Sequence, residues 1–334
     1  MKSGVITNDT KIIVTGGLGF IGSNFILHTY RKYPNCQIIN LDAELLGSNK
    51  KNLDETKNKN KYKYIKGNIN DKNTVEKLIK NCDVVFNFAA ESHVDRSIDQ
   101  PKPFFDSNIM GTYTVLEAIR KYNKKLIHIS TDEVFGSLKS GSATEEYPFN
   151  PSSPYAASKA SAELLVKSYH TTYGINAIIT RCTNNYGPRQ FPEKLIPKTI
   201  LLAMNDKNIP VYGTGKNKRD WIFVYDHCEG ILQVCNNGKY GSSYNISGNN
   251  EYDNNTIVKK ILKIMKKPIS LIKYVKDRPG HDFRYSLDMT KIQKEIGWKP
   301  EFSFEQGLDI TVNWYLNNEK WWKHIQRNKI GRTR

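Results

Sequence analysis

The chain has 334 residues, of which 38% are hydrophobic and 11% aromatic, so it is long and apolar enough to bury a large core. This composition excludes a chain that is disordered throughout. Fifty Lys and Arg against 33 Asp and Glu give a net charge of +17, but no helix-turn-helix, zinc-finger or glycine-aromatic RNA-binding motif accompanies it. We therefore expect no nucleic-acid partner, and a basic surface that attracts anionic metabolites.

The cysteines are scattered and form no CxxC pair: Cys36, Cys82, Cys182, Cys228 and Cys235. This pattern predicts neither a disulfide framework nor a metal site. No apolar run is long enough to span a bilayer, and the first ten residues lack the layout of a signal peptide. We expect a cytoplasmic protein with no membrane partner.

Strands and helices alternate over the first 180 residues. Short β-branched or apolar runs predict strands at residues 11–15, 37–42, 61–67, 83–89, 125–130 and 177–181. Helical spacing predicts helices at residues 23–33, 74–81, 103–122 and 155–173. This alternation predicts an α/β fold with a Rossmann-type, doubly wound parallel sheet.

The pattern loosens after residue 184, where Gly, Pro and Asn become frequent. Strands are expected at residues 209–212 and 220–224, and helices at 225–236 and 256–265. We expect residues 1–183 to form one domain and residues 184–334 a second, smaller α/β domain. Residues 219–240 are expected to return to the first domain.

A glycine-rich loop follows the first predicted strand, with Gly16, Gly19 and Gly22 spaced three apart. Glycines allow a tight turn and let the backbone approach a pyrophosphate, while the next helix offers its N–H donors. Asp42 ends the second predicted strand, where its carboxylate can accept from a ribose 2′-hydroxyl. The loop predicts an NAD site and favours NAD over NADP, with a purely structural turn as the alternative.

Tyr155 and Lys159 stand four residues apart, so they share one face of the predicted helix. A nearby ammonium and a positive nicotinamide both favour the phenolate, which lets a tyrosine act as a base. An ordinary surface pair is the alternative. The position of the pair downstream of a dinucleotide loop favours the catalytic interpretation.

Thr131, Asp132 and Glu133 follow the strand predicted at residues 125–130. Ligands of open α/β sheets bind beyond the carboxyl ends of the strands. Two adjacent carboxyl groups can divide acid and base roles if their surroundings separate their pKa values. A solvated pair in a loop is the alternative.

These motifs together resemble the nucleotide-sugar 4,6-dehydratases of the extended short-chain dehydrogenase superfamily. The resemblance covers residues 11–298 and rests on TGGLGFIGS, AAESHVDRSI, STDEVFG, SPYAASKA, NNYGPRQFPEKLIP, RDWIFVYDH, YNISG and DRPGHDFRY. The Thr-Asp-Glu triplet separates these dehydratases from the related 4-epimerases and decarboxylases. The expected substrate is dTDP-glucose, and UDP-glucose is the alternative. Thymine differs from uracil by one methyl group, so the shape of the base pocket decides between the two substrates.

The resemblance implies a dehydration with internal redox. Tyr155, assisted by Lys159, takes the proton of the sugar 4-hydroxyl while C4 gives a hydride to NAD⁺. Glu133 then removes the C5 proton, Asp132 protonates the departing 6-hydroxyl, and the hydride returns to C6. Thr131 would hydrogen-bond the 4-oxygen. The product is a 4-keto-6-deoxy sugar nucleotide, made for deoxysugar biosynthesis.

The resemblance also implies the binding residues. Those expected to hold NAD are Gly16, Gly19, Phe20, Ile21, Gly22, Asp42, Asn68, Ile69, Phe88, Ala89, Ala90, Glu91, Ser107, Tyr155, Lys159 and Asn185. Those expected to hold the sugar nucleotide are Ser92, Thr131, Asn184, Lys194, Leu195, Pro210, Tyr212, Arg219, Asn245, Asp277, Arg278 and His281. The guanidinium groups of Arg219 and Arg278 suit a diphosphate because each can donate two parallel hydrogen bonds to phosphate oxygens.

The chain departs from the family pattern at three places. Asn68 replaces the usual Asp at the adenine position, and we expect a weaker contact there. Residues 43–49 lack the usual Lys and Tyr, which leaves the ribose and adenine contacts of that segment open. Tyr225 replaces an acid in a turn that we interpret as structural.

Two further groups of residues are assigned to structure or assembly. His93 is expected to orient its loop, and the aromatic cluster Trp314, Tyr315, Trp321 and Trp322 is expected to pack in the core. The helices at residues 103–122 and 155–173 carry apolar or small residues on more than one face. The resemblance implies a homodimer through these helices.

The alternative to the dehydratase function, from another class of protein, is a catalytically idle NAD-binding protein that acts through partners.

Overall fold

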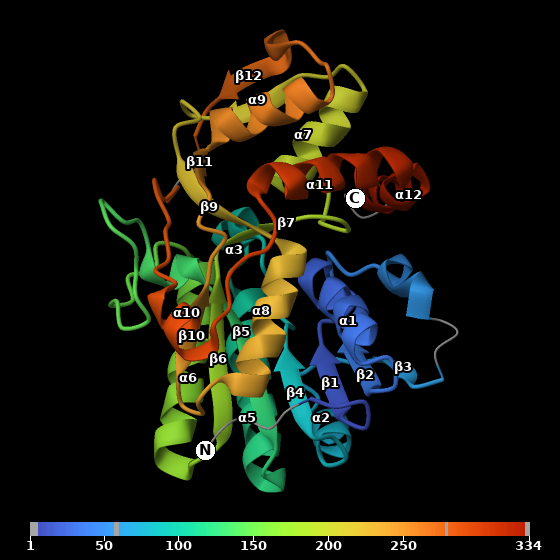
Figure 1. The fold of residues 1–334 in the computed structure, drawn as a ribbon, viewed down its shortest axis with the longest axis vertical. Helices are drawn as coiled ribbons and strands as arrows, with labels where there is room; N and C mark the ends of the chain where they lie inside the picture. Colours follow the sequence, from blue (N-terminus) through green and yellow to red (C-terminus); the bar gives the residue numbers. More distant parts are fainter. Residues whose placement is uncertain (1–5, 57–59, 278–279, 331–334) are drawn as a thin grey trace.

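A seven-stranded parallel sheet forms the centre of the protein. The structure is a computed structural model that describes residues 6–56, 60–277 and 280–330 (Figure 1). The strands of the sheet are β1 (Lys11–Thr15), β2 (Gln37–Asp42), β3 (Tyr62–Lys66), β4 (Val84–Asn87), β5 (Lys125–Thr131), β6 (Asn176–Cys182) and β10 (Ser243–Ile246). Their order is β10-β6-β5-β4-β1-β2-β3, and every pairing is parallel. The predicted Rossmann-type fold is confirmed.

Helices cover both faces of this sheet, as its buried strands require. One face carries α1 (Phe20–Lys32) and α8 (Val224–Asn237), and the other carries α2 (Lys72–Ile79), α5 (Gly111–Tyr122) and α6 (Pro154–Tyr173). Successive strand residues point to opposite faces, so Ile12 packs in the same core cluster as Phe25 of α1, whereas Ile13 packs with Val115 of α5.

The chain between β4 and β5 is an almost continuous helical run. It consists of α3 (Val94–Asp99), α4 (Lys102–Phe104), a π-helical turn η2 (Phe105–Met110) and then α5. A π-helical turn often marks a functional site. Here it sits beside the carboxyl end of β4.

A second group of elements lies above the carboxyl end of the sheet (Figure 1). It contains α7 (Leu195–Met204), α9 (Asn254–Ile264), α11 (Phe304–Asn317) and α12 (Glu319–Ile330), a three-stranded sheet of β11 (Glu251–Asp253), β9 (Lys218–Phe223) and β7 (Asn184–Tyr186), and a parallel pair of β8 (Ile209–Tyr212) and β12 (Ile272–Val275). These elements enclose two apolar clusters of their own.

Short helical pieces complete the chain. They are η1 (Lys50–Thr56), η3 (Asp132–Phe135), η4 (Ile269–Leu271) and α10 (Thr290–Ile296). α10 packs on α8 and β10, so a late segment of the chain returns to the central sheet. Throughout the described ranges, each helix is too short or too polar to cross a lipid bilayer.

Candidate active site

A cleft of ≈ 310 Å³ opens at the carboxyl edge of the parallel sheet, where ligands of such sheets bind. It gathers residues from the loops that follow β1, β2, β3, β4, β5 and β6, and from α6. The expected residues that line it are Gly16, Gly19, Phe20, Ile21, Gly22, Asp42, Asn68, Ile69, Phe88, Ala89, Ala90, Glu91, Ser92, Ser107, Thr131, Asp132, Glu133, Tyr155, Lys159, Asn184, Asn185 and Lys194. All the residues expected to bind NAD thus lie around one cavity.

The glycine loop is packed so tightly that larger residues do not fit. Gly16 has a φ of +69°, and a Cβ there would lie 2.8 Å from the Cα of Ala89. A Cβ on Gly22 would lie 2.5 Å from the carbonyl oxygen of Gly16. α1 begins at Phe20, immediately after this turn, so its free N–H groups border the cleft. The loop has the form of an anion cradle.

Asp42 also organises this loop from the end of β2. Its Oδ2 accepts from the backbone N–H of Leu18 at 2.9 Å, and its Oδ1 accepts from the N–H of Glu44 and the hydroxyl of Ser48, each at 2.8 Å. Burial raises the pKa of the Asp42 carboxyl. Asn68 lies exposed at the edge of the cleft, and its Oδ1 accepts from the N–H of Asn70 at 2.9 Å.

The backbone of Glu91 is fixed by the π-helical turn. Asn108 accepts from the Glu91 N–H at 2.9 Å and donates to the Glu91 carbonyl at 3.0 Å. The same amide donates to the Ser158 hydroxyl of α6 at 2.8 Å. The turn therefore ties the loop after β4 to the helix that carries the Tyr–Lys pair, and Ser107 beside it lines the cleft.

Tyr155 and Lys159 lie in the first turns of α6, which begins at Pro154. The hydroxyl of Ser153 caps this helix by accepting from the N–H of Ala156 at 3.1 Å. Lys159 Nζ donates to the carbonyl of Ile129 at 2.6 Å, which anchors the ammonium to β5. Burial lowers the pKa of Lys159 to about 8.

The main effects on the pKa of Tyr155 run in the direction opposite to our expectation, although a hydrogen bond with Thr131 lowers it. Burial raises the pKa of the Tyr155 phenol well above its ordinary value, and the carboxylate of Glu133 raises it further. The anchored Lys159 does not offset these two effects. The phenol is therefore protonated at neutral pH unless a further positive charge enters the cleft.

Asp132 and Glu133 begin η3, directly after β5 ends at Thr131. Thr131 Oγ1 donates to Asp132 Oδ1 at 3.1 Å and accepts from the Glu133 N–H at 3.3 Å. Asp132 is 3% exposed, and its buried Oδ2 has no partner among the described residues. Burial raises the pKa of Asp132 well above its ordinary value, and Glu133 raises it further. Both effects favour the protonated form of the Asp132 carboxyl.

The other residues expected to bind the substrate lie outside the lining of this cleft. Leu195 is the first residue of α7, next to Lys194. Asp277 contacts His281 at 2.7 Å, and the His281 ring meets Tyr212 edge-on at 6.3 Å. Pro210 lies on β8, two residues before Tyr212. Arg278 lies outside the described residues.

The side chains of Arg219 and Asn245 donate hydrogen bonds to backbone carbonyls of the protein itself. The guanidinium of Arg219 donates to the carbonyls of Asp282 at 2.8 Å and Lys218 at 2.7 Å. Asn245 is fully buried and donates to the carbonyl of Ala143 at 2.9 Å. In this conformation both side chains hold loops together.

The cleft also contains residues that the sequence analysis did not select: Leu41, Ala43, Leu45, Leu46, Gly47, Ser48, Gly67, Ile129, Ser130, Cys182, Thr183, Gln190 and Phe191. The register of the sheet places Cys182 directly beside Thr131. Once Thr131 at the end of β5 was selected, Cys182 at the end of the neighbouring β6 could therefore have been added to the expected site residues. Gln190 and Phe191 lie inside the motif NNYGPRQFPEKLIP, between the selected residues Asn185 and Lys194, so the motif itself could have added them.

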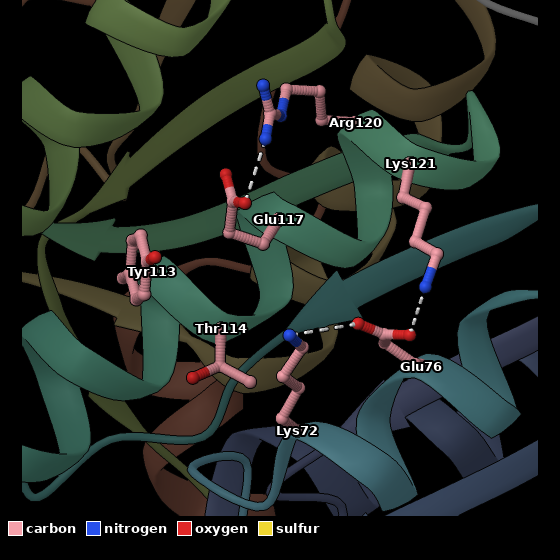
Figure 2. Close-up of a pocket in the computed structure, with 7 residues that line it drawn as sticks. All are labelled: Lys72, Glu76, Tyr113, Thr114, Glu117, Arg120 and Lys121. Carbon is pink, nitrogen blue, oxygen red and sulfur yellow. Dashed lines mark hydrogen bonds and ion pairs between the residues drawn. The ribbon is translucent and has the colours of Figure 1, made fainter.

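A second cavity, of ≈ 350 Å³, lies between α2 and α5 (Figure 2). Its charged groups pair with one another, and three cations against two carboxylates leave a net charge of +1. Glu76 pairs with Lys121 at 2.6 Å, and Glu117 pairs with Arg120 at 2.9 Å. This cavity shares no residue with the cleft at the sheet edge.

The glycine cradle and the Tyr–Lys pair, together at the carboxyl edge of one parallel sheet, define a dinucleotide-binding enzyme of the short-chain dehydrogenase class. A family model described as GDP-mannose 4,6 dehydratase matches residues 13–311. A dTDP-glucose 4,6-dehydratase of Xanthomonas campestris pv. campestris is 45% identical, over 92% of this chain and 94% of the relative.

Solved structures agree with these matches. A dTDP-glucose 4,6-dehydratase of Bacillus anthracis in complex with NAD has a TM-score of 0.89 and 45% identity, over 94% of this chain and 99% of that one. The corresponding enzyme of Streptomyces venezuelae, with NAD and TYD bound, has a TM-score of 0.91 and 42% identity, over 94% and 99%. The chain belongs to the dTDP-glucose 4,6-dehydratase family.

Proposed function

We propose that this protein is an NAD-dependent hydro-lyase that converts dTDP-glucose to dTDP-4-keto-6-deoxyglucose and water. The observation that carries the proposal is the meeting of Tyr155, Asp132 and Glu133 in one cleft beside the glycine cradle. Kinship with dTDP-glucose 4,6-dehydratases over more than nine-tenths of the chain supports it.

The residues of the cleft fit NAD. The turn at Gly16 and Gly22 leaves room only for backbone, which suits a pyrophosphate. The buried hydroxyls of Ser130 and Thr183 have no partner among the described residues, so they are available to a ligand. When bound, NAD⁺ supplies the hydride acceptor and a positive charge that favours the Tyr155 phenolate.

The protein's own groups divide the proton transfers. We assign Tyr155 to accept the proton of the sugar 4-hydroxyl, with Lys159 as its cationic neighbour. Glu133 would take the C5 proton, which a 4-ketone makes acidic. Asp132, whose pKa is raised by burial, would give its proton to the departing 6-hydroxyl. Thr131 would hold the 4-oxygen. The adjacent carboxyl groups therefore play opposite roles.

We also propose that the chain divides this work between two regions. Residues 1–183 with residues 219–240 would hold NAD, and residues 184–334 would hold the sugar nucleotide. The diphosphate and base would lie toward Asp277, His281 and Tyr212, which contact one another. Arg219 and Asn245 would support this region through the loops that they tie.

Product analysis tests the proposed function. The purified protein is incubated separately with dTDP-glucose and with UDP-glucose, without added NAD⁺, and the products are weighed. We expect loss of one water from dTDP-glucose and slower loss from UDP-glucose. Equal or faster loss from UDP-glucose would reassign the substrate. No loss from either, even with NAD⁺ added, would favour an idle NAD-binding protein.

We further propose a homodimer through α5 and α6, which pack side by side. Large apolar side chains stay exposed here: Leu164 is 56% exposed, Met110 52% and Tyr113 42%. A second copy of the same face would cover them as a four-helix contact. The paired charges of the cavity in Figure 2 border this face at Tyr113.

The cytoplasmic assignment remains a prediction. All five cysteines are buried and none forms a disulfide among the described residues, which suits a reducing compartment. Cell fractionation checks this assignment: we expect the tagged protein in the cytoplasmic fraction.

A further inference from the structure

The C-terminal helices α11 and α12 reach the proposed cofactor site. Their aromatic residues form part of one buried cluster, in which the rings of Trp314 and Trp321 lie 4.8 Å apart at a steep angle. Figure 1 shows both helices above the carboxyl end of the sheet. Packing accounts for the rings, but it does not account for where their polar atoms point.

A relay of two hydrogen bonds joins α12 to the glycine loop. The indole N–H of Trp321 donates to Asn52 Oδ1 at 2.7 Å, and Asn52 Nδ2 donates to the carbonyl of Leu18 at 2.9 Å. Leu18 is the residue between the loop glycines Gly17 and Gly19. Asn52 and Leu18 are each only 2% exposed, so water does not replace these bonds.

Hydrogen-bond chemistry fixes the direction of this relay. An indole nitrogen only donates, so Trp321 requires the oxygen of the Asn52 amide. The NH₂ group must then face the Leu18 carbonyl. The N–H of the same residue is held by Asp42 at 2.9 Å, so both polar groups of Leu18 are fixed.

The same C-terminal unit supports a second part of the cleft. The hydroxyl of Tyr315 donates to the carbonyl of Gln190, and the Gln190 amide donates to the carbonyl of Asn185 at 2.8 Å. Gln190 and Asn185 both line the cleft. Two separate contacts therefore connect the end of the chain to the place expected for NAD.

We propose that Trp321 and Asn52 are positioning residues for the cofactor. They hold the glycine loop in the shape that receives the pyrophosphate, so binding does not have to order it. The expected consequence is slow release of NAD, which suits an enzyme that regenerates its cofactor in every turnover. This inference rests on NAD as the cofactor of the proposed function.

Three full-length variants test the relay. Trp321→Phe removes the donor and keeps an aromatic ring, and Asn52→Asp keeps the acceptor but places an oxygen against the Leu18 carbonyl. Trp322→Phe is the matched control, because the indole of Trp322 donates to the Tyr315 carbonyl at 3.1 Å instead of to Asn52. The readouts are the NAD retained after gel filtration, the Kd for added NAD⁺, the melting temperature, and kcat and KM.

Loss of one buried hydrogen bond predicts a Kd for NAD⁺ about 5- to 10-fold higher in Trp321→Phe. Asn52→Asp is expected to raise the Kd for NAD⁺ more than Trp321→Phe does, and Trp322→Phe is expected to change this Kd by less than about twofold. At saturating NAD⁺, kcat is expected to stay within about twofold of the parent for both relay variants. Combining the two relay substitutions is expected to cost less than the sum of their single effects.

Three outcomes overturn the inference. They are a folded Trp321→Phe that binds NAD⁺ like the parent, an equal loss in Trp322→Phe, or a loss of kcat with unchanged NAD binding. If Trp321→Phe does not fold, Asn52→Asp decides alone, and normal NAD affinity in that variant refutes the relay. A parent protein that binds no NAD would instead refute the proposed function.

Discussion

Asp132 and Tyr155 share an unusual setting for acid–base groups, because both side chains are buried and burial raises the pKa of both, which favours their protonated forms. For Asp132 this suits the assigned role, since an acid must carry its proton at neutral pH. For Tyr155 it means that the base is formed only when ligand binding changes the local charge. Burial thus serves the two groups differently.

Asp132→Asn is expected to abolish dehydration and to stabilise the fold. A carboxyl whose pKa is raised by folding destabilises the protein once the pH exceeds its unfolded value of about 4. The amide does not ionise. The variant should therefore unfold at a higher temperature than the parent at pH 7, with a difference that shrinks toward pH 4.

Thermal unfolding between pH 4 and pH 8 checks this prediction. The control is Asp309→Asn on the exposed side of α11, where a substitution usually changes the unfolding free energy by under about 0.5 kcal/mol. An Asp132→Asn variant that is less stable than the parent at pH 7 would contradict the raised pKa.

Tyr155→Phe is expected to lower kcat by about 10²- to 10⁴-fold, the usual contribution of a positioned base. The ring and its edge-on contact with Phe104 at 6.3 Å remain possible, so KM should change little. Steady-state kinetics on dTDP-glucose measure both constants. A variant that keeps a tenth of the parent's kcat would remove Tyr155 from the mechanism.

At the scale of elements, the site exists because several strands end and several helices begin at one edge of the sheet. β5 ends at Thr131, and α6 begins one residue before Tyr155. Neither side chain needs an unusual backbone of its own. The exception is the glycine loop, where close approach of backbone to backbone leaves no room for a Cβ.

Gly22→Ala is expected to reduce NAD binding by at least about tenfold, because a contact of 2.5 Å with the Gly16 carbonyl must be relieved by moving the loop. Gly174→Ala is the control. Gly174 ends α6 with a φ of +69° and open space around it, so its replacement costs about 1 kcal/mol of stability and leaves the cleft alone. Equal NAD affinity in Gly22→Ala and the parent would contradict the packing argument.

The early elements could be predicted from the sequence, and the later ones only in part. β1 and β2 match the expected runs to the residue, because β-branched segments ended by Gly or Asp have few alternatives. α7 was not predicted: Pro197 stands in its first turn and its residues are almost all apolar, so no periodic face appears. β10 is four residues long and gains its place only by pairing with β6.

The candidate site shows the same limit. Residues placed by local chain geometry, such as the glycine loop and the Thr131–Asp132 turn, were selected from the sequence and line the cleft. Arg219 donates to the carbonyl of Asp282, 63 residues away, and Asn245 donates to the carbonyls of Asp288 and Ala143, 43 and 102 residues away. No local pattern reveals such contacts. The relay from Trp321 to Asn52 spans 269 residues and is invisible for the same reason.

At the scale of the whole molecule, the exposed apolar face on α5 and α6 predicts assembly. The parent should have twice the chain mass of 38.4 kDa in light scattering at micromolar concentration. Leu164→Arg buries an unpaired charge in the proposed contact and should give the monomer mass.

Ile269→Arg is the control for this experiment, because Ile269 is 67% exposed on η4, away from α5 and α6. It should remain dimeric. A monomeric parent, or a dimeric Leu164→Arg, would exclude this face as the contact.

The central claim is that oxidation at C4 and reduction at C6 occur in one cleft with one retained cofactor. The most direct measurement uses dTDP-glucose that carries deuterium at C4, in ordinary water, with product analysis by mass spectrometry and NMR. We predict a product that has lost one water, carries the deuterium in its C6 methyl group and has a solvent-derived hydrogen at C5. Deuterium that is absent from the product, or found in released cofactor, would contradict the account.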